Sequence, residues 1–132
     1  MSTPIYGSTN LAPSSRSNEE VKRFASVIEI SPEKESYYRQ LHADVWPSVL
    51  KQIKQSHIRN YSIYFAPIAG KIYLFSYFEY SGKDFTSDIE KMAADLETQR
   101  WWAECKPCQI PLENNAPGEW WKDLEEVFHF NS

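Results

Sequence analysis

The sequence lacks the features that mark several common classes of protein. Its formal net charge is −4, so it has no surplus of basic residues with which to bind nucleic acid. No apolar run approaches the roughly 18–20 residues that a membrane-spanning helix needs. The glycine-rich phosphate loop, the nucleophile elbow and the HExxH motif are absent. We therefore expect no nucleic-acid partner and no membrane partner, and nucleotide enzymes, serine hydrolases and zinc proteases lack their usual motifs.

Cysteine is also scarce, and the two that occur lack the context of a functional pair. Cys105 and Cys108 have CxxC spacing, but they follow a predicted helix and enter a proline-containing loop, whereas a thioredoxin-type motif opens a helix. A zinc site would need two more ligands, and the 3 histidines are scattered. We expect two free thiols, no metal and no cofactor. Because no secretory leader is visible either, we expect a cytoplasmic protein.

Aromatic side chains are what the chain has in excess, at 15% of its 132 residues. In an acidic chain such rings are candidates for sugar binding, because flat apolar faces pack against sugar C–H groups while polar neighbours orient the hydroxyls. The length suits one domain. Residues 1–20 are rich in Ser, Thr, Asn and Pro and are expected to form a flexible tail, which leaves residues 21–132 as the folded domain.

The hydrophobic periodicity of this domain predicts the order β-α-β-β-α-β. Strands are expected at 22–30, 60–66, 71–80 and 126–130, and helical segments at 33–57, 85–92 and 95–104. Ser31 and Pro32 suit the N-cap and the first position of the first helix. Pro47 cannot donate the helical hydrogen bond, so it predicts a break near residues 44–47. Residues 67–70 contain a proline and a glycine and are expected to form a hairpin loop.

This order is that of the ferredoxin-like α+β fold, a four-stranded sheet with two helices on one face. The strand 71–80 is apolar or aromatic on both sides, with Ile72 and Leu74 on one side and Tyr73 and Phe75 on the other. Such a strand needs cover on both faces. Because the helices cover only one face, the other predicts a homodimer with C2 symmetry.

Two pairs of residues are candidates for chemistry. Tyr38 and His42 share a helix face, and His42 lies in the middle of an apolar arc. Such a histidine is either a core residue bonded within the fold or the general acid–base of a pocket, because its pKa is the nearest to neutrality. Trp101 and Trp102 are adjacent on a helix, so one could pack in the core while the other lines a cavity. The residues alone leave these alternatives open.

Four motifs, taken in order, resemble the L-rhamnose mutarotase family. They are YRQLHADVWP beginning at Tyr38, NYSIY beginning at Asn60, QRWW beginning at Gln99 and LEEVF beginning at Leu124. Their order and spacing agree from about residue 22 to the C-terminus. The resemblance implies a dimeric α/β barrel built from ferredoxin-like subunits. It also implies an enzyme that interconverts the α and β anomers of L-rhamnose or a close 6-deoxy-hexose.

The resemblance further implies roles for single residues. In the family's pattern the histidine of Tyr-x3-His is the proton donor, which here is His42. Tyr38, Tyr61, Trp101 and Trp102 would contact the sugar. The chain differs from the pattern in its N-terminal tail, in a longer segment at 81–98 and in an added Trp120-Trp121 pair.

The implied chemistry suits these residue types. Mutarotation takes a proton from the anomeric hydroxyl and gives one to the ring oxygen, so one placed acid–base pair suffices without a metal or cofactor. Which group serves which oxygen is open at this point. Two other readings fit the same aromatic cavity: a non-catalytic dimeric barrel that binds a sugar-like ligand, and a cofactor-free oxygenase on the same scaffold.

Overall fold

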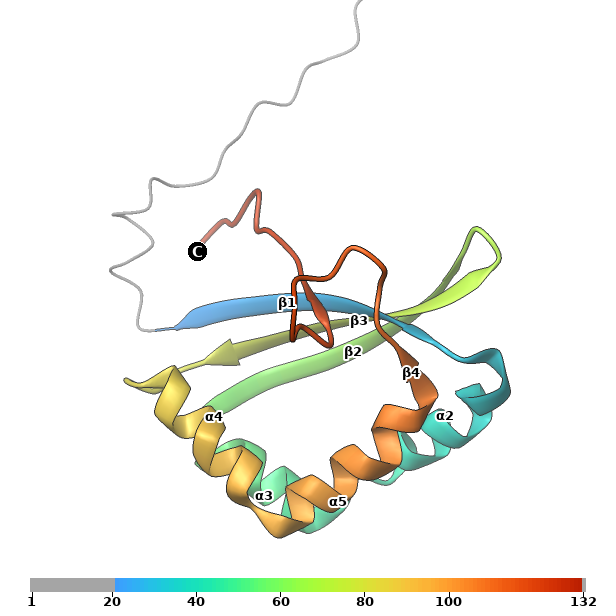
Figure 1. Ribbon diagram of the computed structural model, residues 1–132. Coiled ribbons are helices and arrows are strands. Elements are labelled where there is room, and N and C mark those ends of the chain that lie inside the picture. The colour runs from blue at the N-terminus through green and yellow to red at the C-terminus, as the bar shows by residue number, and fades with distance from the viewer. Residues whose placement is uncertain (1–20, 132) are drawn as a thin grey trace, which may run out of the picture.

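A single antiparallel sheet, with every helix on one of its faces, forms the structure, a computed structural model that describes residues 21–131 (Figure 1). The sheet order is β2-β3-β1-β4, with β5 pairing with β1 as well. The strands are β1 (Lys22–Ile30), β2 (Ile58–Ile68), β3 (Lys71–Tyr80), β4 (Gln109–Ile110) and β5 (Lys122–Asp123). This order confirms the ferredoxin-like α+β prediction. The tail expected at 1–20 lies outside the described residues.

Each crossover between strands contains two helices rather than one. They are α2 (Glu35–Ala43), α3 (Pro47–Gln55), α4 (Phe85–Ala94) and α5 (Leu96–Cys105), with short 3-10 turns at Pro32–Lys34 and Lys106–Cys108. Pro47 is the first residue of α3, so the predicted break before it is confirmed. Asp95 ends α4 and accepts a hydrogen bond from Thr98 N at 2.9 Å, which caps α5. Ser31 holds the predicted N-cap position, but its side chain makes no capping bond.

The hairpin between β2 and β3 is tighter than the sequence predicts. Pro67 and Ile68 continue β2, and only Ala69 and Gly70 form the turn, with φ of 51° and 82°. Two successive positive φ values characterise the two-residue hairpin turn whose twist matches that of the strands. Proline is tolerated in β2 because this strand lies at the edge of the sheet, where a missing N–H breaks no ladder.

The prediction of a last strand at 126–130 is wrong. β5 pairs Lys122 with Val27 and Asp123 with Ser26, and Leu124 N donates to Ala25 O at 2.9 Å. Continued in this register, residues beyond 127 would run past the start of β1 at residue 22, so they have no strand to pair with. The C-terminal segment instead lies on the side of the sheet away from the helices (Figure 1). Phe128 and Phe130 are exposed there.

The two faces of the sheet differ in cover. The helix side carries the core, and its fully or nearly buried side chains include Ile28, Ile30 and Leu74. On the other side Tyr73, Phe75 and Tyr77 are only partly buried, and no helix covers them (Figure 1). β3 therefore presents Leu74 to the helices and Tyr73 and Phe75 to the other side, as the sequence predicts. Among the described residues no helix is long and apolar enough to cross a membrane.

The turn geometry generates a stability prediction. Ala69 holds a left-handed conformation, which costs a residue with a Cβ roughly 1–2 kcal/mol and which asparagine tolerates better. We expect Ala69→Asn to raise the free energy of unfolding by up to about 1 kcal/mol. Gly70→Ala should lower it by about 1 kcal/mol for backbone reasons alone, since an added Cβ would meet nothing within 4 Å. Urea denaturation measures both, and equal stabilities for the three proteins would contradict the turn.

Candidate functional site

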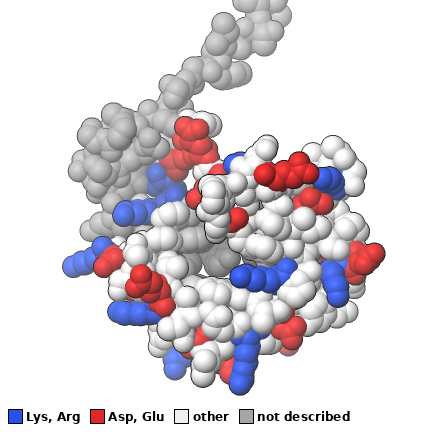
Figure 2. Space-filling model, in the orientation of Figure 1, with Lys and Arg blue, Asp and Glu red and all other residues white. Residues whose placement is uncertain are grey.

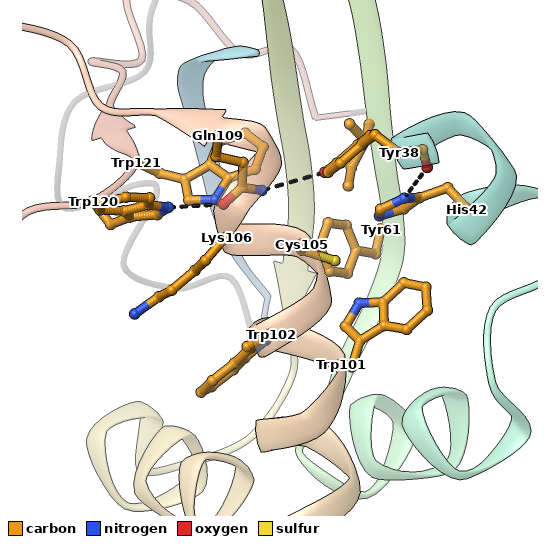
Figure 3. Close-up of a pocket in the computed structure, with 11 residues that line it drawn as sticks. Tyr38, His42, Tyr61, Trp101, Trp102, Cys105, Lys106, Gln109, Trp120 and Trp121 are labelled. Carbon is orange, nitrogen blue, oxygen red and sulfur yellow. Dashed lines mark hydrogen bonds between the residues drawn. The ribbon is translucent and has the colours of Figure 1, made fainter. Parts of the chain in front are cut away.

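All five residues singled out in the sequence line one pocket on the helix side of the sheet (Figure 3). Its volume is about 280 Å³. The lining comes from α2, β2, α5, the 3-10 turn that follows α5, β4 and the loop after β4: Tyr38, His42, Tyr61, Ile63, Trp101, Trp102, Cys105, Lys106, Gln109, Trp120 and Trp121. Two adjoining hollows of about 270 and 300 Å³ also border His42, so this ring lies where three spaces meet.

His42 is held in one tautomer by its own helix. Its Nδ1 lies 2.9 Å from the backbone oxygen of Tyr38, and a carbonyl can only accept, so Nδ1 carries the proton. In the neutral ring Nε2 therefore keeps its lone pair. The imidazole stacks on the Tyr38 ring at 4.1 Å and meets the edge of Trp101 at 5.2 Å. Burial against these rings lowers the pKa of His42 from its ordinary value.

The two tyrosines reach the pocket from different elements. Tyr38 is 4% exposed, and burial raises the pKa of its hydroxyl far above the ordinary value. Tyr61 is 44% exposed as a whole residue, but its hydroxyl lies among the pocket side chains, and this burial raises its pKa to about 12. Both phenols are therefore neutral near pH 7 and can donate as well as accept hydrogen bonds.

A bulge in β2 directs Tyr61 toward the helices. Between Arg59 and Ser62 the register with β3 shifts, and Asn60 adopts a positive φ of 51°. The extra residue lets Ile58 and Tyr61, three positions apart, both face the helix side. Asn60 secures the bulge by donating from Nδ2 to Glu79 Oε1 at 2.7 Å.

The tryptophans form the apolar walls. Trp101 is 7% exposed and packs against His42 and, at 5.2 Å, against Trp46. Trp101 belongs to the buried core cluster and Trp102 is half-buried, and both also line the pocket. Trp120 and Trp121 supply a further wall, which the sequence showed only as added bulk.

Gln109 and Lys106 belong to the site although sequence reasoning missed them. Gln109 Nε2 donates to the Tyr38 hydroxyl at 3.4 Å, and its Oε1 accepts from Trp120 Nε1 at 2.7 Å (Figure 3). The Lys106 ammonium lies 5.5 Å above the Trp120 ring. No local pattern marks either residue, because their position depends on the pairing of β4 with the distant β1.

The two cysteines are free, as predicted, and the structure shows that both are buried. Burial raises the pKa of Cys105, which borders the pocket, to about 12, and it also raises that of Cys108. Protonated thiols are poor nucleophiles and poor metal ligands. Within residues 21–131 no group of three or more His, Cys, Asp or Glu side chains is placed to hold a metal ion. On the face that Figure 2 shows, acidic and basic side chains intermingle without a field of one sign.

Comparison with known proteins identifies the family of the chain. The family model of L-rhamnose mutarotase matches residues 23–130. The chain belongs to the L-rhamnose mutarotase family. The L-rhamnose mutarotases of Oceanobacillus iheyensis and Bacillus subtilis are 30% and 31% identical to it, over 84% of this chain and 100% of theirs.

Solved structures confirm the dimeric α/β barrel class of fold. An L-rhamnose mutarotase from Formosa agariphila superposes with a TM-score of 0.61 at 22% identity, covering 83% of this chain and 99% of that one. The tetracenomycin F2 cyclase of Streptomyces glaucescens superposes with a TM-score of 0.58 at 9% identity, covering 84% and 98%. At these identities the likeness shows the fold, which this family shares with a cyclase of polyketides.

The environment of His42 predicts its titration. We expect ¹⁵N NMR to show the Nδ1–H tautomer and a pKa below about 6.5, the ordinary value. As pH falls through that value, unfolded chains bind a proton that the folded protein resists, so folding stability should fall. His42→Asn should remove this contribution to the pH dependence. A pKa at or above the ordinary value, or an Nε2–H tautomer, would contradict the geometry.

Proposed function

We propose that this protein catalyses the interconversion of the α and β anomers of L-rhamnose, or of a close 6-deoxy-hexose, with His42 as the general acid–base. The observation that carries the proposal is the fixed tautomer of His42. Its Nδ1–H is bound to the Tyr38 carbonyl, and the other ring nitrogen, which has a free lone pair, lies on the side toward Tyr61 (Figure 3). A base of lowered pKa is in its active, neutral form near pH 7.

The reaction needs little more than this base and a neighbouring hydroxyl. Ring opening removes the proton of the anomeric hydroxyl, forms the carbonyl at C1 and breaks the bond from C1 to the ring oxygen, which gains a proton. The aldehyde then rotates about the C1–C2 bond and the ring closes on its other face. Two neutral phenols, Tyr38 and Tyr61, border the same space as His42 and can exchange hydrogen bonds with the sugar.

The shape and lining of the pocket support a single sugar ring. About 280 Å³ lies just under the roughly 300–1,000 Å³ common for small-molecule sites, which suits one monosaccharide. Trp101 and Trp102 offer apolar faces for the C–H groups and the methyl of a 6-deoxy sugar. We assign substrate contact to these two residues and to Tyr38 and Tyr61.

We further propose that the protein is a homodimer formed through the sheet face that the helices leave open. Tyr64 of β2 lies on this face, opposite Phe75 of the neighbouring strand β3, and is 63% exposed. The C-terminal segment lies on the same side of the sheet and adds the exposed side chains of Val127 and Phe128. Exposed apolar and aromatic side chains gathered on one face are typical of an interface between subunits.

The catalytic proposal predicts a large effect of one substitution. His42→Ala should slow anomer exchange of L-rhamnose by roughly 10²–10⁴-fold, because one general acid–base group is lost. NMR saturation transfer between the anomers measures the rate, and calorimetry checks that the variant still binds the sugar. Equal rates for the two proteins, both above buffer, would remove His42 from its role. Binding without any acceleration by the wild type would favour a non-catalytic sugar-binding barrel.

The dimer proposal predicts a change of mass. Light scattering should give twice the chain mass of 15.5 kDa for the wild type. Tyr64→Lys, which buries a charge if the face is paired, should shift the protein toward the monomer. The control is Leu96→Lys, because Leu96 is 74% exposed on a helix at the opposite face. A wild-type monomer, or dissociation by the control alone, would refute this interface.

A further inference from the structure

Gln109 lies beside the candidate acid–base pair, yet it belongs to none of the motifs that mark the family. Pairing of β4 with the end of β1 places it there: Gln109 is opposite Ile30, and Ser31 N donates to Cys108 O at 2.8 Å. The half-buried side chain extends from this point between Trp120 and Tyr38 (Figure 3). Gln109 thereby connects the loop between β4 and β5, here called the late loop, to helix α2.

Trp120 decides which way the Gln109 amide faces. The indole Nε1 of Trp120 lies 2.7 Å from Gln109 Oε1, and an indole nitrogen can only donate. The amide oxygen must therefore point to Trp120. The amino group Nε2 then points to the Tyr38 hydroxyl at 3.4 Å, and it too can only donate. The Tyr38 oxygen accepts this bond, so its own proton is left for another acceptor.

The late loop holds Trp120 in place. Asn115 Nδ2 donates to the backbone oxygens of Glu119 and Trp120, at 3.0 Å each. The Glu119 carboxylate accepts from two backbone amides of the same loop, at 3.1 and 3.2 Å. Lys106 lies over the face of the indole ring. These contacts fix the indole N–H, and through it the amide, without any contribution from a bound sugar.

We infer that Gln109 and Trp120 are positioning residues that direct the Tyr38 hydroxyl proton into the pocket, toward an oxygen that can only accept. This inference rests on the proposed function. In a pyranose the ring oxygen O5 has no hydrogen, whereas the anomeric oxygen O1 carries one, and both are bonded to C1. Tyr38 offers a donor and His42 Nε2 an acceptor from rings stacked 4.1 Å apart, so the pair matches O5 and O1 respectively.

The resulting step balances. Nε2 of His42 takes the O1 proton, the O–H electron pair forms the C1–O1 double bond, and the C1–O5 pair moves to O5, which takes the Tyr38 proton. The Gln109 N–H group stabilises the oxygen of Tyr38 as it gains charge. Ring closure on the other face of the aldehyde returns both protons. If the amide were inverted, Tyr38 would donate to Gln109 Oε1 and O5 would find no proton.

Two substitutions at Gln109 separate this role from simple packing. Gln109→Glu keeps the shape, but the carboxylate can only accept, so one oxygen serves Trp120 while the other takes the Tyr38 proton away from the pocket. We expect kcat for L-rhamnose anomer exchange to fall by roughly 10²-fold, as for Tyr38→Phe, with KM little changed. Gln109→Met leaves the Tyr38 proton free and should cost only about fivefold, the loss of one hydrogen bond.

The deciding measurement repeats Gln109→Glu in a Tyr38→Phe background. Because Gln109 acts through the Tyr38 hydroxyl, we expect less than about a twofold further loss of kcat there. Equal losses in both backgrounds, or a Gln109→Glu variant as active as the wild type, would overturn the inference. Wild-type protein that fails to accelerate anomer exchange would instead refute the proposed function, so the two failures are distinct.

Two further variants serve as controls. Trp120→Phe removes the indole N–H and frees the Gln109 amide to invert, so the kcat of this variant should fall between those of Gln109→Met and Gln109→Glu. The same variant tests the inference if Gln109→Glu does not fold. An unchanged kcat for Trp120→Phe would count against the inference. Tyr37→Phe removes a neighbouring hydroxyl from the same helix. Because Tyr37 is exposed and its hydroxyl donates to Glu104 at 2.9 Å outside the pocket, the kcat of Tyr37→Phe should equal that of the wild type. Circular dichroism establishes that each variant is folded.

Discussion

The structure depends on the pairing of β1 along both of its edges. One edge pairs with β3 over the whole strand, from Lys22 opposite Tyr80 to Ile30 opposite Ile72. At the Ile30 end of β1, the other edge of the strand pairs Ile30 with Gln109 of β4. Both crossover connections therefore meet at the point where β1 ends and the chain turns into α2. The pocket lies at this meeting point, which is why its lining comes from segments far apart in the sequence.

Local structure then sets the polarity of the site. The spacing of four residues along α2 stacks His42 on Tyr38 and also brings the imidazole to the Tyr38 carbonyl, which fixes the Nδ1–H tautomer. From the other side, the indole of Trp120 fixes the amide of Gln109. An acceptor and a donor are thus oriented by groups outside the space that a sugar would occupy. Such preorganisation avoids reorganisation when charge develops on the substrate.

Prediction from sequence succeeded where the information is local and failed where it is not. The strand at 22–30, the break before Pro47 and the Tyr38–His42 face all follow from short-range patterns, and the structure has them. The strand expected at 126–130 fails because its existence depends on how much of β1 remains to pair with, which the pattern cannot show. Gln109 was missed for the same reason. Its neighbours are set by sheet register, so no spacing along the chain points to it.

Strand register also decides which side chains of β2 face the pocket, which the hydrophobic pattern alone leaves undetermined. β3 is apolar or aromatic on both sides, so a slip of one residue between β2 and β3 would exchange one apolar face for the other at little cost in burial. Such a slip would move Tyr61 and Ile63 out of the pocket. Two local devices prevent it: the two-residue turn at Ala69 and Gly70 sets the pairing at one end, and the bulge at Asn60 sets it at the other. An excess of aromatic residues that serves two faces therefore needs backbone features, rather than the hydrophobic pattern, to keep the site on the correct one.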